Sequence, residues 1–228
     1  MRSKTAATPD RQDIAARTLV INEIFLSIQG ETTKAGLPTV FIRLTGCPLR
    51  CGYCDTAYAF SAGEKTTIGD ILQAVGGYRT RHVTVTGGEP LAQKDCLHLL
   101  TLLCDEGYQV SLETSGALDI AGVEDRVVKI LDIKTPASGE AGRNLYQNLD
   151  YLTPNDQIKF VICNREDYAW SKSKLLEYRL NDRCEVLFSA SHGQLTASDL
   201  ADWILRDRLP VRLQIQLHKY LWGDVPGR

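Results

Sequence analysis

The stretch GCPLRCGYCDT, residues 46–56, places Cys47, Cys51 and Cys54 in one short loop. The loop follows TVFIRLTG (39–46), an apolar and β-branched run that predicts a strand. A closed tetrahedral metal site uses four ligands, so three thiolates leave such a site incomplete. In a four-iron cluster each iron needs a ligand, and three cysteines leave one iron open to another molecule. The loop therefore predicts either a zinc site completed from elsewhere in the chain or a cluster with an open iron.

The rest of the chain offers few partners for a zinc site. No second pair of closely spaced cysteines follows the loop, and the histidines are scattered singly. Four other cysteines lie in apolar patterns, where this residue usually packs as a small hydrophobic side chain. The histidines are His82, His98, His192 and His218, and the four cysteines are Cys96, Cys104, Cys163 and Cys184. The iron–sulfur interpretation is therefore favoured.

Short apolar runs alternate with longer amphipathic ones along most of the chain. Strands that alternate with helices indicate a mostly parallel α/β sheet. Thr66 or Thr67 is expected to cap the first helix of this pattern. Strands are expected at 19–28, 39–46, 82–87, 108–114, 127–134, 157–163, 184–190 and 211–217, and helices at 66–78, 90–106, 165–179 and 196–207.

Two connections are too short for a complete eightfold α/β barrel. About a dozen residues join ETSG (113–116) to the next expected strand, which barely fits a crossover of ~10–12 residues with its own helix. The segment 135–156 has room for one short helix at most, around NLYQNLDYL. The 228 residues are also fewer than the ~250 of a typical full barrel. The expected fold is a partial, open α/β barrel with some helices trimmed away.

The chain divides into a polar N-terminal extension, 1–18, and one domain, 19–228. The opening MRSKTAATPDRQDIAAR lacks the apolar centre of a secretory signal and is expected to be a loose extension. No run approaches the ~20 apolar residues of a membrane span. The formal net charge of −2 gives no basic field for nucleic acid. We therefore expect a cytoplasmic protein that binds neither membrane nor nucleic acid, with its thiols reduced or metal-bound.

Several motifs give the chain a family resemblance. The C-x3-C-x2-C spacing, with Tyr53 before its last cysteine, resembles the cluster loop of the radical S-adenosylmethionine (SAM) superfamily. TGGEPL (86–91) resembles the glycine-rich segment of the same superfamily. Four more stretches resemble the 7-carboxy-7-deazaguanine synthase family within it, from about residue 19 to near the end of the chain. They are EIFLSIQGE (23–31), FIRLTGCPLRCGYCDTAYA (41–59), ETSG (113–116) and LQIQLHKYLWG (213–223).

The resemblance implies a radical-SAM-type barrel that catalyses a ring contraction in deazapurine (queuosine) biosynthesis. The substrate would be 6-carboxy-5,6,7,8-tetrahydropterin, and the products would be 7-carboxy-7-deazaguanine and ammonia. The cofactors implied are a 4Fe-4S cluster, SAM bound at its open iron, and magnesium. The implied partners are an electron-donating reductase or flavodoxin and a second copy of the chain in a homodimer.

The resemblance also implies roles for individual residues. Cys47, Cys51 and Cys54 would hold the cluster, and the hydroxyl of Thr56, in the CDT motif, would bind magnesium. Gly88 and Glu89 would take the amino group of SAM. The full set for SAM would be Tyr53, Cys54, Asp55, Gly88, Glu89, Gly116, Asp132, Lys134, Phe188 and Ser189, and the set for the pterin would be Ile28, Gln29, Gly30, Arg43 and Thr114.

Arg43 can also be argued from its strand. Phe41, Arg43 and Thr45 share one face of that strand, because strand side chains alternate. On an interior face a lone guanidinium needs a partner, since burying an unpaired charge is costly. The substrate carboxylate would be that partner, bound through two N–H groups. The plainer alternative is a solvated or salt-bridged strand arginine, and Gln29–Gly30 is open to a similar reading as a simple turn.

Two other functions stay open from the sequence. A radical SAM activase that acts on a protein partner shares the cysteine spacing, although the SIQGE and CDT motifs favour the pterin enzyme. A non-catalytic zinc or iron–sulfur module would bind metal without cleaving SAM. Such a module gives no reason for the TGGEP motif.

Overall fold

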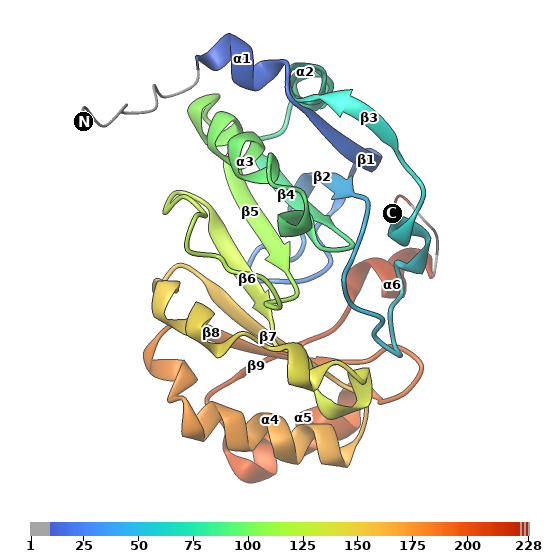
Figure 1. The fold of residues 1–228 in the computed structure, drawn as a ribbon. Helices are drawn as coiled ribbons and strands as arrows, with labels where there is room; N and C mark the ends of the chain where they lie inside the picture. The colour runs from blue at the N-terminus through green and yellow to red at the C-terminus, as the bar shows by residue number, and fades with distance from the viewer. Residues whose placement is uncertain (1–9, 224, 226, 228) are drawn as a thin grey trace, which may run out of the picture.

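Nine strands form one open, curved sheet in the computed structural model, which describes residues 10–223, 225 and 227 (Figure 1). The strand order is β3-β1-β2-β4-β5-β6-β7-β8-β9. β1 is antiparallel to both of its neighbours, and each pair from β2 onwards is parallel. The open, trimmed α/β barrel predicted from the sequence is confirmed. The strands are β1 (Thr18–Ile28), β2 (Pro38–Leu44), β3 (Glu64–Thr67), β4 (His82–Gly87), β5 (Gln109–Thr114), β6 (Val128–Asp132), β7 (Gln157–Ile162), β8 (Glu185–Ala190) and β9 (Arg212–Gln214).

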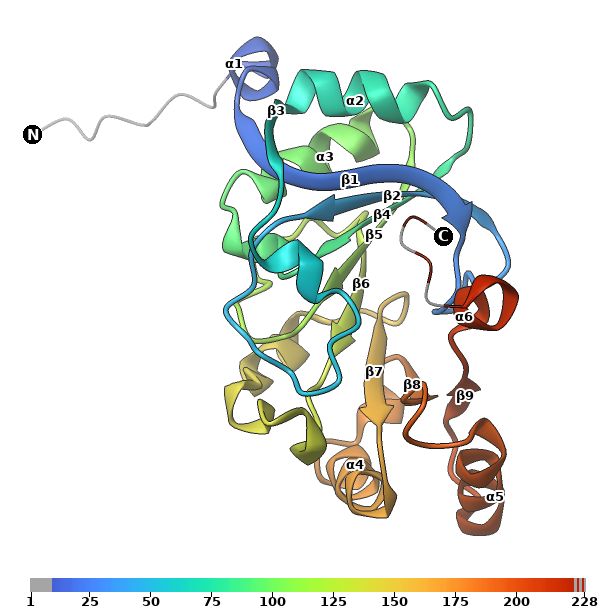
Figure 2. The ribbon, with the colours of Figure 1, turned by 90° about the vertical axis from the view of Figure 1, so that its right-hand side faces the viewer.

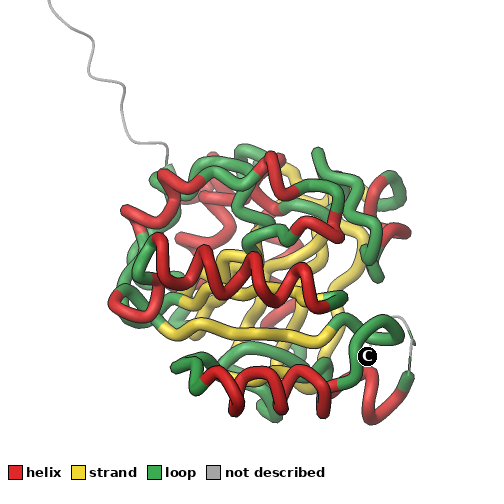
Figure 3. The backbone as a smooth tube through the Cα atoms, turned by 90° about the horizontal axis from the view of Figure 1, so that it is seen from below, coloured by secondary structure: helices red, strands yellow, loops and turns green. Residues whose placement is uncertain are grey.

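Helices α1 to α5 lie outside the curved sheet, so the space inside the curve is left to loops, side chains and the short α6 (Figures 2 and 3). Side chains of Thr67, Asn164 and Thr196 accept the backbone N–H three residues further on and so cap α2, α4 and α5. The predicted cap at Thr67 is thereby confirmed. The helices are α1 (Arg11–Ala15), α2 (Ile68–Gly76), α3 (Cys96–Asp105), α4 (Arg165–Glu177), α5 (Ala197–Asp207) and α6 (Leu217–Trp222). No helix of the described chain is long and apolar enough to pass through a bilayer.

Part of the expected N-terminal extension is structured. Residues 1–9 of it, and 224, 226 and 228 of the expected domain, lie outside the described residues. Arg11–Ala15, expected to be loose, instead form α1, and Ile14 packs against the hydrophobic core. The carbonyl of Arg17 accepts a hydrogen bond of 2.8 Å from the backbone N–H of Ile68, which begins α2. Apolar packing of Ile14 and the hydrogen bond to Arg17 together hold this segment against the domain.

The helix predicted at 90–106 is wrong in its first turns. Pro90–Ala92 form a separate 3₁₀ turn, and α3 begins only at Cys96. Gln93 has extended dihedrals, and its side-chain amide bonds the backbone of β1 and the end of β2: Nε2 donates to the carbonyls of Val20 and Thr45, and Oε1 accepts from Val20 N–H. The chain leaves the helical conformation so that this amide reaches the sheet.

The two short connections have different outcomes. No helix separates β5 from β6, as their spacing predicted. The segment 135–156 holds three 3₁₀ turns, where one short helix at most was expected. These turns are built around side chains that bond backbone: Asn144 accepts from Lys134 N–H, and Asn148 accepts from Ile120 N–H. The amides fix an irregular path without a regular helix.

The last expected strand, 211–217, is shortened to β9, and the chain then turns into α6. The change follows from two glutamines. The Gln214 Oε1 accepts from the backbone N–H of Thr32, and the Gln216 Nε2 donates to Asp55. Both bonds draw the chain away from the sheet and over its concave side, so that α6 lies near the end of β1 (Figure 2).

A β-bulge interrupts β1 beside the expected site. Ile21 pairs with Leu44 and Glu23 pairs with Arg43, so Asn22 has no partner on β2. A bulge of this kind re-aims side chains and increases local twist. It places Ile21 in the core while Glu23 lies opposite Arg43.

The gap between the two halves of the open barrel is closed by side chains. The hairpin loop, residues 29–37, joins β1 to β2 and meets β7 and β9 across the gap. Gln157 accepts from Thr33 N–H at 2.9 Å and donates to its hydroxyl at 2.9 Å, while Gln214 accepts from Thr32 N–H at 2.7 Å. Side-chain amides thus take the place of a continuous strand ladder here.

Candidate active site

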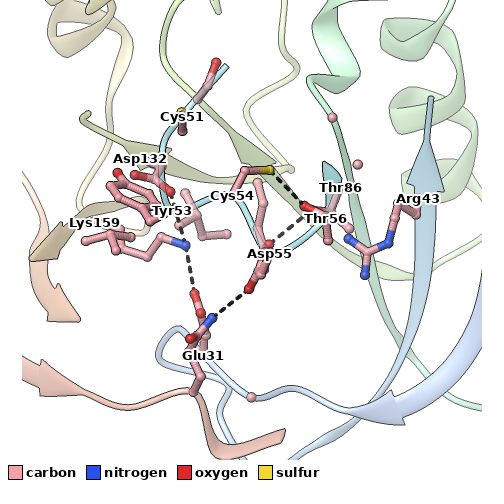
Figure 4. Close-up of a pocket in the computed structure, with 18 of the residues that line it drawn as sticks. Glu31, Arg43, Cys51, Tyr53, Cys54, Asp55, Thr56, Thr86, Asp132 and Lys159 are labelled. Atoms are coloured by element: carbon pink, nitrogen blue, oxygen red, sulfur yellow. Dashed lines mark hydrogen bonds and ion pairs between the residues drawn. The ribbon is translucent and has the colours of Figure 1, made fainter. Parts of the chain in front are cut away.

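A pocket lies inside the curve of the sheet, at the carboxyl ends of the parallel strands (Figure 4). This is the end at which α/β barrels place their active sites. The cysteine loop forms one wall, and the hairpin loop and α6 form another. The predicted site residues that line it are Ile28, Gln29, Gly30, Arg43, Cys47, Cys51, Tyr53, Cys54, Asp55, Thr56, Gly88, Thr114, Asp132 and Lys134.

Main-chain contacts hold the cysteine loop against the end of the sheet. The N–H of Gly88 donates to Leu44 O at 3.1 Å, and the N–H of Glu89 donates to Gly46 O at 2.7 Å. A Cβ on Gly88 would lie 2.2 Å from Gly46 O and 2.9 Å from the Cβ of Cys47. Gly88 therefore allows the glycine-rich turn and the cysteine loop to touch, in addition to its predicted place beside SAM.

The three thiols of this loop are free and half-buried. Burial raises the pKa of Cys47 and raises that of Cys51 to about 11, so both are thiols at neutral pH until a metal displaces the proton. In the described part of the chain, no three His, Cys, Asp or Glu side chains converge to hold a single ion. Cluster thiolates each bind a different iron, so they need not converge. The donor set and its place on the pocket wall fit a cluster.

The other four cysteines are buried, as predicted for small hydrophobic residues. Cys96 is fully enclosed, and its burial raises the pKa of its thiol well above the ordinary value. None of the four lines the pocket. They belong to the packing of the sheet and helices.

A chain of charges crosses the pocket floor from the hairpin loop to β6. Lys159 Nζ lies 2.8 Å from Glu31 and 3.3 Å from Asp132 Oδ2, and Lys134 Nζ lies 3.1 Å from the same oxygen. Burial opposes ionisation of Asp132, but the two ammonium groups outweigh it and lower its pKa. Burial likewise opposes the charge on Lys159, but Glu31 and Asp132 raise its pKa well above the ordinary value. Asp132, Lys134 and Lys159 therefore carry charge at neutral pH through mutual pairing.

Asp132 has one carboxylate oxygen left over. Its Oδ1 is buried and has no hydrogen-bond partner among the described residues. A buried unpaired acceptor is costly, so this atom calls for a donor from a ligand in the pocket. Ribose hydroxyls and an ammonium group are such donors, which fits the predicted contact of Asp132 with SAM. Lys134 lies beside it, with its Nζ 5.9 Å from the ring centre of Tyr53.

Glu89 does not line the pocket. Its carboxylate is fully buried and accepts from Leu91 N–H, Thr114 Oγ1, Ser115 N–H and Ser115 Oγ. In the structure this side chain is bonded inside the protein, and its expected contact with the amino group of SAM stays a prediction. Glu89 joins the end of β4 to the end of β5.

Three further residues predicted to contact SAM also lie off the pocket wall. Gly116 has a φ of 71°, and its carbonyl accepts from Leu145 N–H and Asn148 Nδ2, which places it in the structure behind β5. Phe188 and Ser189 are buried within β8. Ser191 and His192, which directly follow this strand, line the pocket. The expected contact of SAM near Phe188 and Ser189 stays a prediction.

The side chain of Gln29 is used inside the protein. Its Nε2 donates to Thr84 at 3.2 Å and to Glu113 at 3.4 Å, and its Oε1 accepts from Glu31 N–H at 3.1 Å. Its amide therefore shapes the hairpin loop, and backbone groups remain for a ligand. Gly30 is required here, because a Cβ would lie 2.0 Å from Nδ1 of His218.

Arg43 lines the pocket but is not the lone charge expected from its strand. Its Nε donates to Glu23 Oε1 at 2.6 Å, and its guanidinium carbon lies 5.7 Å and 5.8 Å from the ring centres of Phe25 and Tyr58. The two terminal nitrogens have no partner within the described residues, which leaves them for a ligand. Thr114 is less available, because its hydroxyl donates to Glu89 at 2.9 Å.

Thr56 and Asp55 follow the cysteine loop. The hydroxyl of Thr56 lies on the pocket wall, 3.8 Å from the sulfur of Cys54 (Figure 4). Asp55 pairs with Lys219 at 3.1 Å and accepts from Gln216 at 3.1 Å. Burial opposes its ionisation, yet Lys219 lowers the pKa of Asp55. Asp55 thereby ties α6 to the cysteine loop.

Several pocket residues were missed from the sequence. The clearest signal was Lys159, a charge inside the apolar strand QIKFVI, since a lysine is almost never buried without a partner. Glu113 lies next to the predicted Thr114, and burial raises the pKa of its carboxyl. The remaining missed polar residues are Glu31, Thr86, Ser115, Ser191, His192, Gln216, His218 and Lys219.

Comparison with known sequences agrees with this site. A family model described as the Radical SAM superfamily matches residues 41–173. A 7-carboxy-7-deazaguanine synthase from Chlorobaculum tepidum is 45% identical over 214 residues, covering 92% of this chain and 97% of that protein. A protein of the same name from Koribacter versatilis is 42% identical, over 89% of this chain and 96% of its own length.

Solved structures show the same fold. QueE from Escherichia coli matches with a TM-score of 0.73 and 26% identity, over 88% of this chain and 95% of that one. SuiB from Streptococcus suis, in its structure bound to S-adenosylmethionine, has a similar fold with a TM-score of 0.54, 17% identity and coverage of 75% of this chain and 48% of that one. Since the named relatives match nearly its whole length and its three cysteines line one pocket, the chain belongs to the 7-carboxy-7-deazaguanine synthase family of the radical SAM superfamily.

Proposed function

We propose that this chain converts 6-carboxy-5,6,7,8-tetrahydropterin to 7-carboxy-7-deazaguanine with release of ammonia, using a 4Fe-4S cluster and SAM. The observation that carries the proposal is the meeting of two features in one pocket. The cysteine loop forms one wall, and Arg43 presents free terminal nitrogens from another. The relative with 45% identity favours this reaction over the activase and over a non-catalytic metal module.

The cluster and SAM together supply radical chemistry that no side chain can perform. The protein contributes binding and orientation. Cys47, Cys51 and Cys54 hold the cluster on the wall that Gly88 fixes to the sheet. Asp132 offers its open Oδ1 to SAM, and the ammonium group of Lys134 and the ring of Tyr53 lie near it. Gly88, Asp55 and Cys54 line the part of the pocket that would bind SAM. Glu89 and Gly116 do not line the pocket, and they support this part of it from within the protein.

The pterin lies against the hairpin loop and β2. The terminal nitrogens of Arg43 bind its carboxylate, because a guanidinium matches a carboxylate with two parallel N–H groups. Backbone groups of Ile28, Gln29 and Gly30 meet the flat heterocycle. The reaction removes ammonia and is redox-neutral overall, so the conversion of the pterin to the product would need no net oxidant or reductant.

Thr56 binds magnesium in this proposal. Its hydroxyl oxygen lies on the pocket wall between the sulfur of Cys54 and the side of Arg43 (Figure 4). Magnesium takes few protein ligands and completes its shell with water and substrate oxygens, which suits a single hydroxyl here. Thr56→Val should weaken the magnesium dependence of turnover while iron content and SAM binding stay unchanged.

The wider setting is proposed from the family. The chain works in the cytoplasm as a homodimer, and a reductase or flavodoxin reduces the cluster. Reduced thiols, which the cluster needs, are the ordinary state of cysteines in that compartment.

The direct test is anaerobic reconstitution with iron and sulfide, followed by chromatography of reactions that contain SAM, reductant, magnesium and the carboxypterin. The expected products are 7-carboxy-7-deazaguanine and ammonia in equal amounts, with SAM not consumed. Cys51→Ala is the matched control and should give no product. SAM cleavage without any change in the pterin would overturn the assigned substrate, and absence of a cluster would overturn the whole proposal.

A further inference from the structure

Arg43 is held from outside the pocket by two side chains that do not line it. Glu23 lies directly opposite Arg43 in the β1–β2 ladder because of the bulge at Asn22. Without the extra residue, the register of the first half of β1 would place Asn22 opposite Arg43. The bulge therefore supplies a carboxylate where a neutral amide would otherwise lie.

Glu23 occupies one edge of the guanidinium. Its Oε1 accepts from Arg43 Nε at 2.6 Å and from the Tyr58 hydroxyl at 2.8 Å. The rings of Phe25 and Tyr58 lie 5.7 Å and 5.8 Å from the guanidinium carbon, which suits cation–π contact. One oxygen and two rings thus restrict the rotation of a long side chain.

With Nε bonded to Glu23, the edge of the guanidinium that carries the two terminal nitrogens faces the pocket. Figure 4 shows the Arg43 side chain extending from its strand toward Thr56. Its two terminal nitrogens have no partner in residues 10–223, 225 and 227. Glu23 and Tyr58 are absent from the residues that line the pocket, so both reach a ligand only through Arg43.

We propose that Glu23 is a positioning residue for substrate recognition, which orients the Arg43 guanidinium so that its terminal nitrogens face the substrate carboxylate. Tyr58 assists by fixing the accepting oxygen of Glu23. The inference rests on the proposed role of Arg43 in binding that carboxylate.

Geometry and charge act in opposite directions here, which makes the inference testable. The negative charge of Glu23 repels a substrate carboxylate, so deleting it should strengthen binding if charge alone mattered. A glutamine at this position removes the charge but keeps an oxygen that accepts from Nε. An alanine removes both the charge and the acceptor.

The experiment measures dissociation constants by anaerobic calorimetry, with reconstituted protein and SAM present. The probes are 6-carboxy-5,6,7,8-tetrahydropterin and 5,6,7,8-tetrahydropterin, which lacks the carboxyl group. Glu23→Ala should weaken binding of the carboxylated probe about tenfold, as for other coupled contact pairs, and leave binding of the second probe unchanged. Glu23→Gln should stay close to the unchanged protein. In an Arg43→Ala background, Glu23→Ala should have almost no further effect.

Glu185→Ala is the matched control. Glu185 accepts from Arg212 Nε at 2.9 Å across the β8–β9 pair, and neither residue lines the pocket. It should leave both affinities unchanged. Thermal unfolding of each variant separates a folding defect from a binding defect.

The failures are distinguishable. If Arg43→Ala binds both probes as the unchanged protein does, the proposed role of Arg43 is wrong, and the inference falls with it. If Arg43→Ala weakens the carboxylated probe but Glu23→Ala does not, or strengthens it, Arg43 keeps its role and the positioning by Glu23 is wrong. Loss of thermal stability in Glu23→Ala without a change in affinity would also overturn the inference.

Discussion

Gly88 shows how one residue fixes the distance between two parts of the site. The turn after β4 and the cysteine loop touch at this glycine, where a Cβ would lie 2.2 Å from backbone oxygen. The obstacle is main chain, so rotation of a side chain cannot relieve the clash. Any larger residue must push the cysteine loop away from the sheet.

We expect Gly88→Ala to retain less than about half of the iron of the unchanged protein after reconstitution, because overpacking on this scale shifts backbone. Iron analysis and the absorbance of the cluster would measure the loss. Gly52→Ala is the matched control in the same loop, since its Cβ would make an ordinary contact of 3.5 Å with Ala137 O. Equal iron in both variants would show that this contact does not set the position of the loop.

His218 provides a test by pH. Burial lowers the pKa of its imidazole below the ordinary value of 6.5, although Glu31 and Asp55 oppose the change. The unfolded chain therefore binds a proton at a higher pH than the folded chain does. The stabilisation is complete above pH 6.5 and is lost as the pH falls from 6.5 through the lowered folded pKa.

Chemical denaturation between pH 8 and pH 5 should therefore show a steeper fall in unfolding free energy for the unchanged protein than for His218→Gln. A comparison at pH 8 measures the packing cost of the substitution, where the linkage contributes nothing. If the unfolding free energy fell equally with pH in the two proteins, His218 would not have a lowered pKa in the folded state.

At the scale of elements, a buried ion pair joins β6 to the turn before β7. Lys129 and Asp156 are each 1% exposed and lie 3.2 Å apart. Asp156 also accepts from the N–H groups of Lys129 and Thr153. The carboxylate of Asp156 therefore fixes the turn before β7 and also neutralises the buried Lys129.

Asp156→Ala should lower the free energy of unfolding by roughly 3–5 kcal/mol, because it leaves a buried ammonium without its partner. Asp182→Ala is the control, since Arg179 and Asp182 form a pair of 2.7 Å that is 81% and 60% exposed. The control should cost less than about 1 kcal/mol. Urea denaturation measures both, and similar costs would show that burial does not govern the pair.

The elements that the sequence predicted well are those with a strong local pattern. Apolar runs such as HVTVTG specify β4 without help from the rest of the chain. The break in the helix at Gln93 depends on backbone groups of Val20 and Thr45, far away in sequence. The bulge at Asn22 likewise appears only when β1 is aligned with β2. A local sequence pattern does not show which distant residues will become partners, so these two features could not be predicted.

At the scale of the whole molecule, the site residues also divide into those with a local sequence motif and those brought together only by the fold. The cysteine loop and most of its neighbours were predicted because their motifs are contiguous. The charges of Glu31, Lys159 and Asp132 meet across long stretches of chain, and no local pattern pairs them. The carboxylate of Glu89 turns into the protein, which was not predicted because its motif gives a position in sequence but not the direction of its side chain.

Closure of the open barrel by side chains can be tested directly. Gln157→Ala combined with Gln214→Ala removes the acceptors of Thr33 N–H and Thr32 N–H. Amide exchange in the hairpin loop should then accelerate by roughly tenfold, given ~0.5–1.5 kcal/mol for each hydrogen bond lost. Hydrogen–deuterium exchange with mass spectrometry measures this.

Peptides from β4 serve as the internal reference in that measurement and should exchange as before. Gln109→Ala, a substitution at an exposed position of β5, is the control variant. Faster exchange of the hairpin loop in the control as well would contradict a specific role for the two buried glutamines.

The attachment of the cysteine loop to the sheet also sets an order of events in the life of the protein. Hydrogen bonds from Gly46, Gly88 and Glu89, and from Gly52 to Ser138 O, connect protein atoms only. They form as the sheet forms, so the loss of conformational freedom in this loop belongs to folding. We therefore expect the thiols to be in place before iron binds, so that the cluster is installed into folded protein.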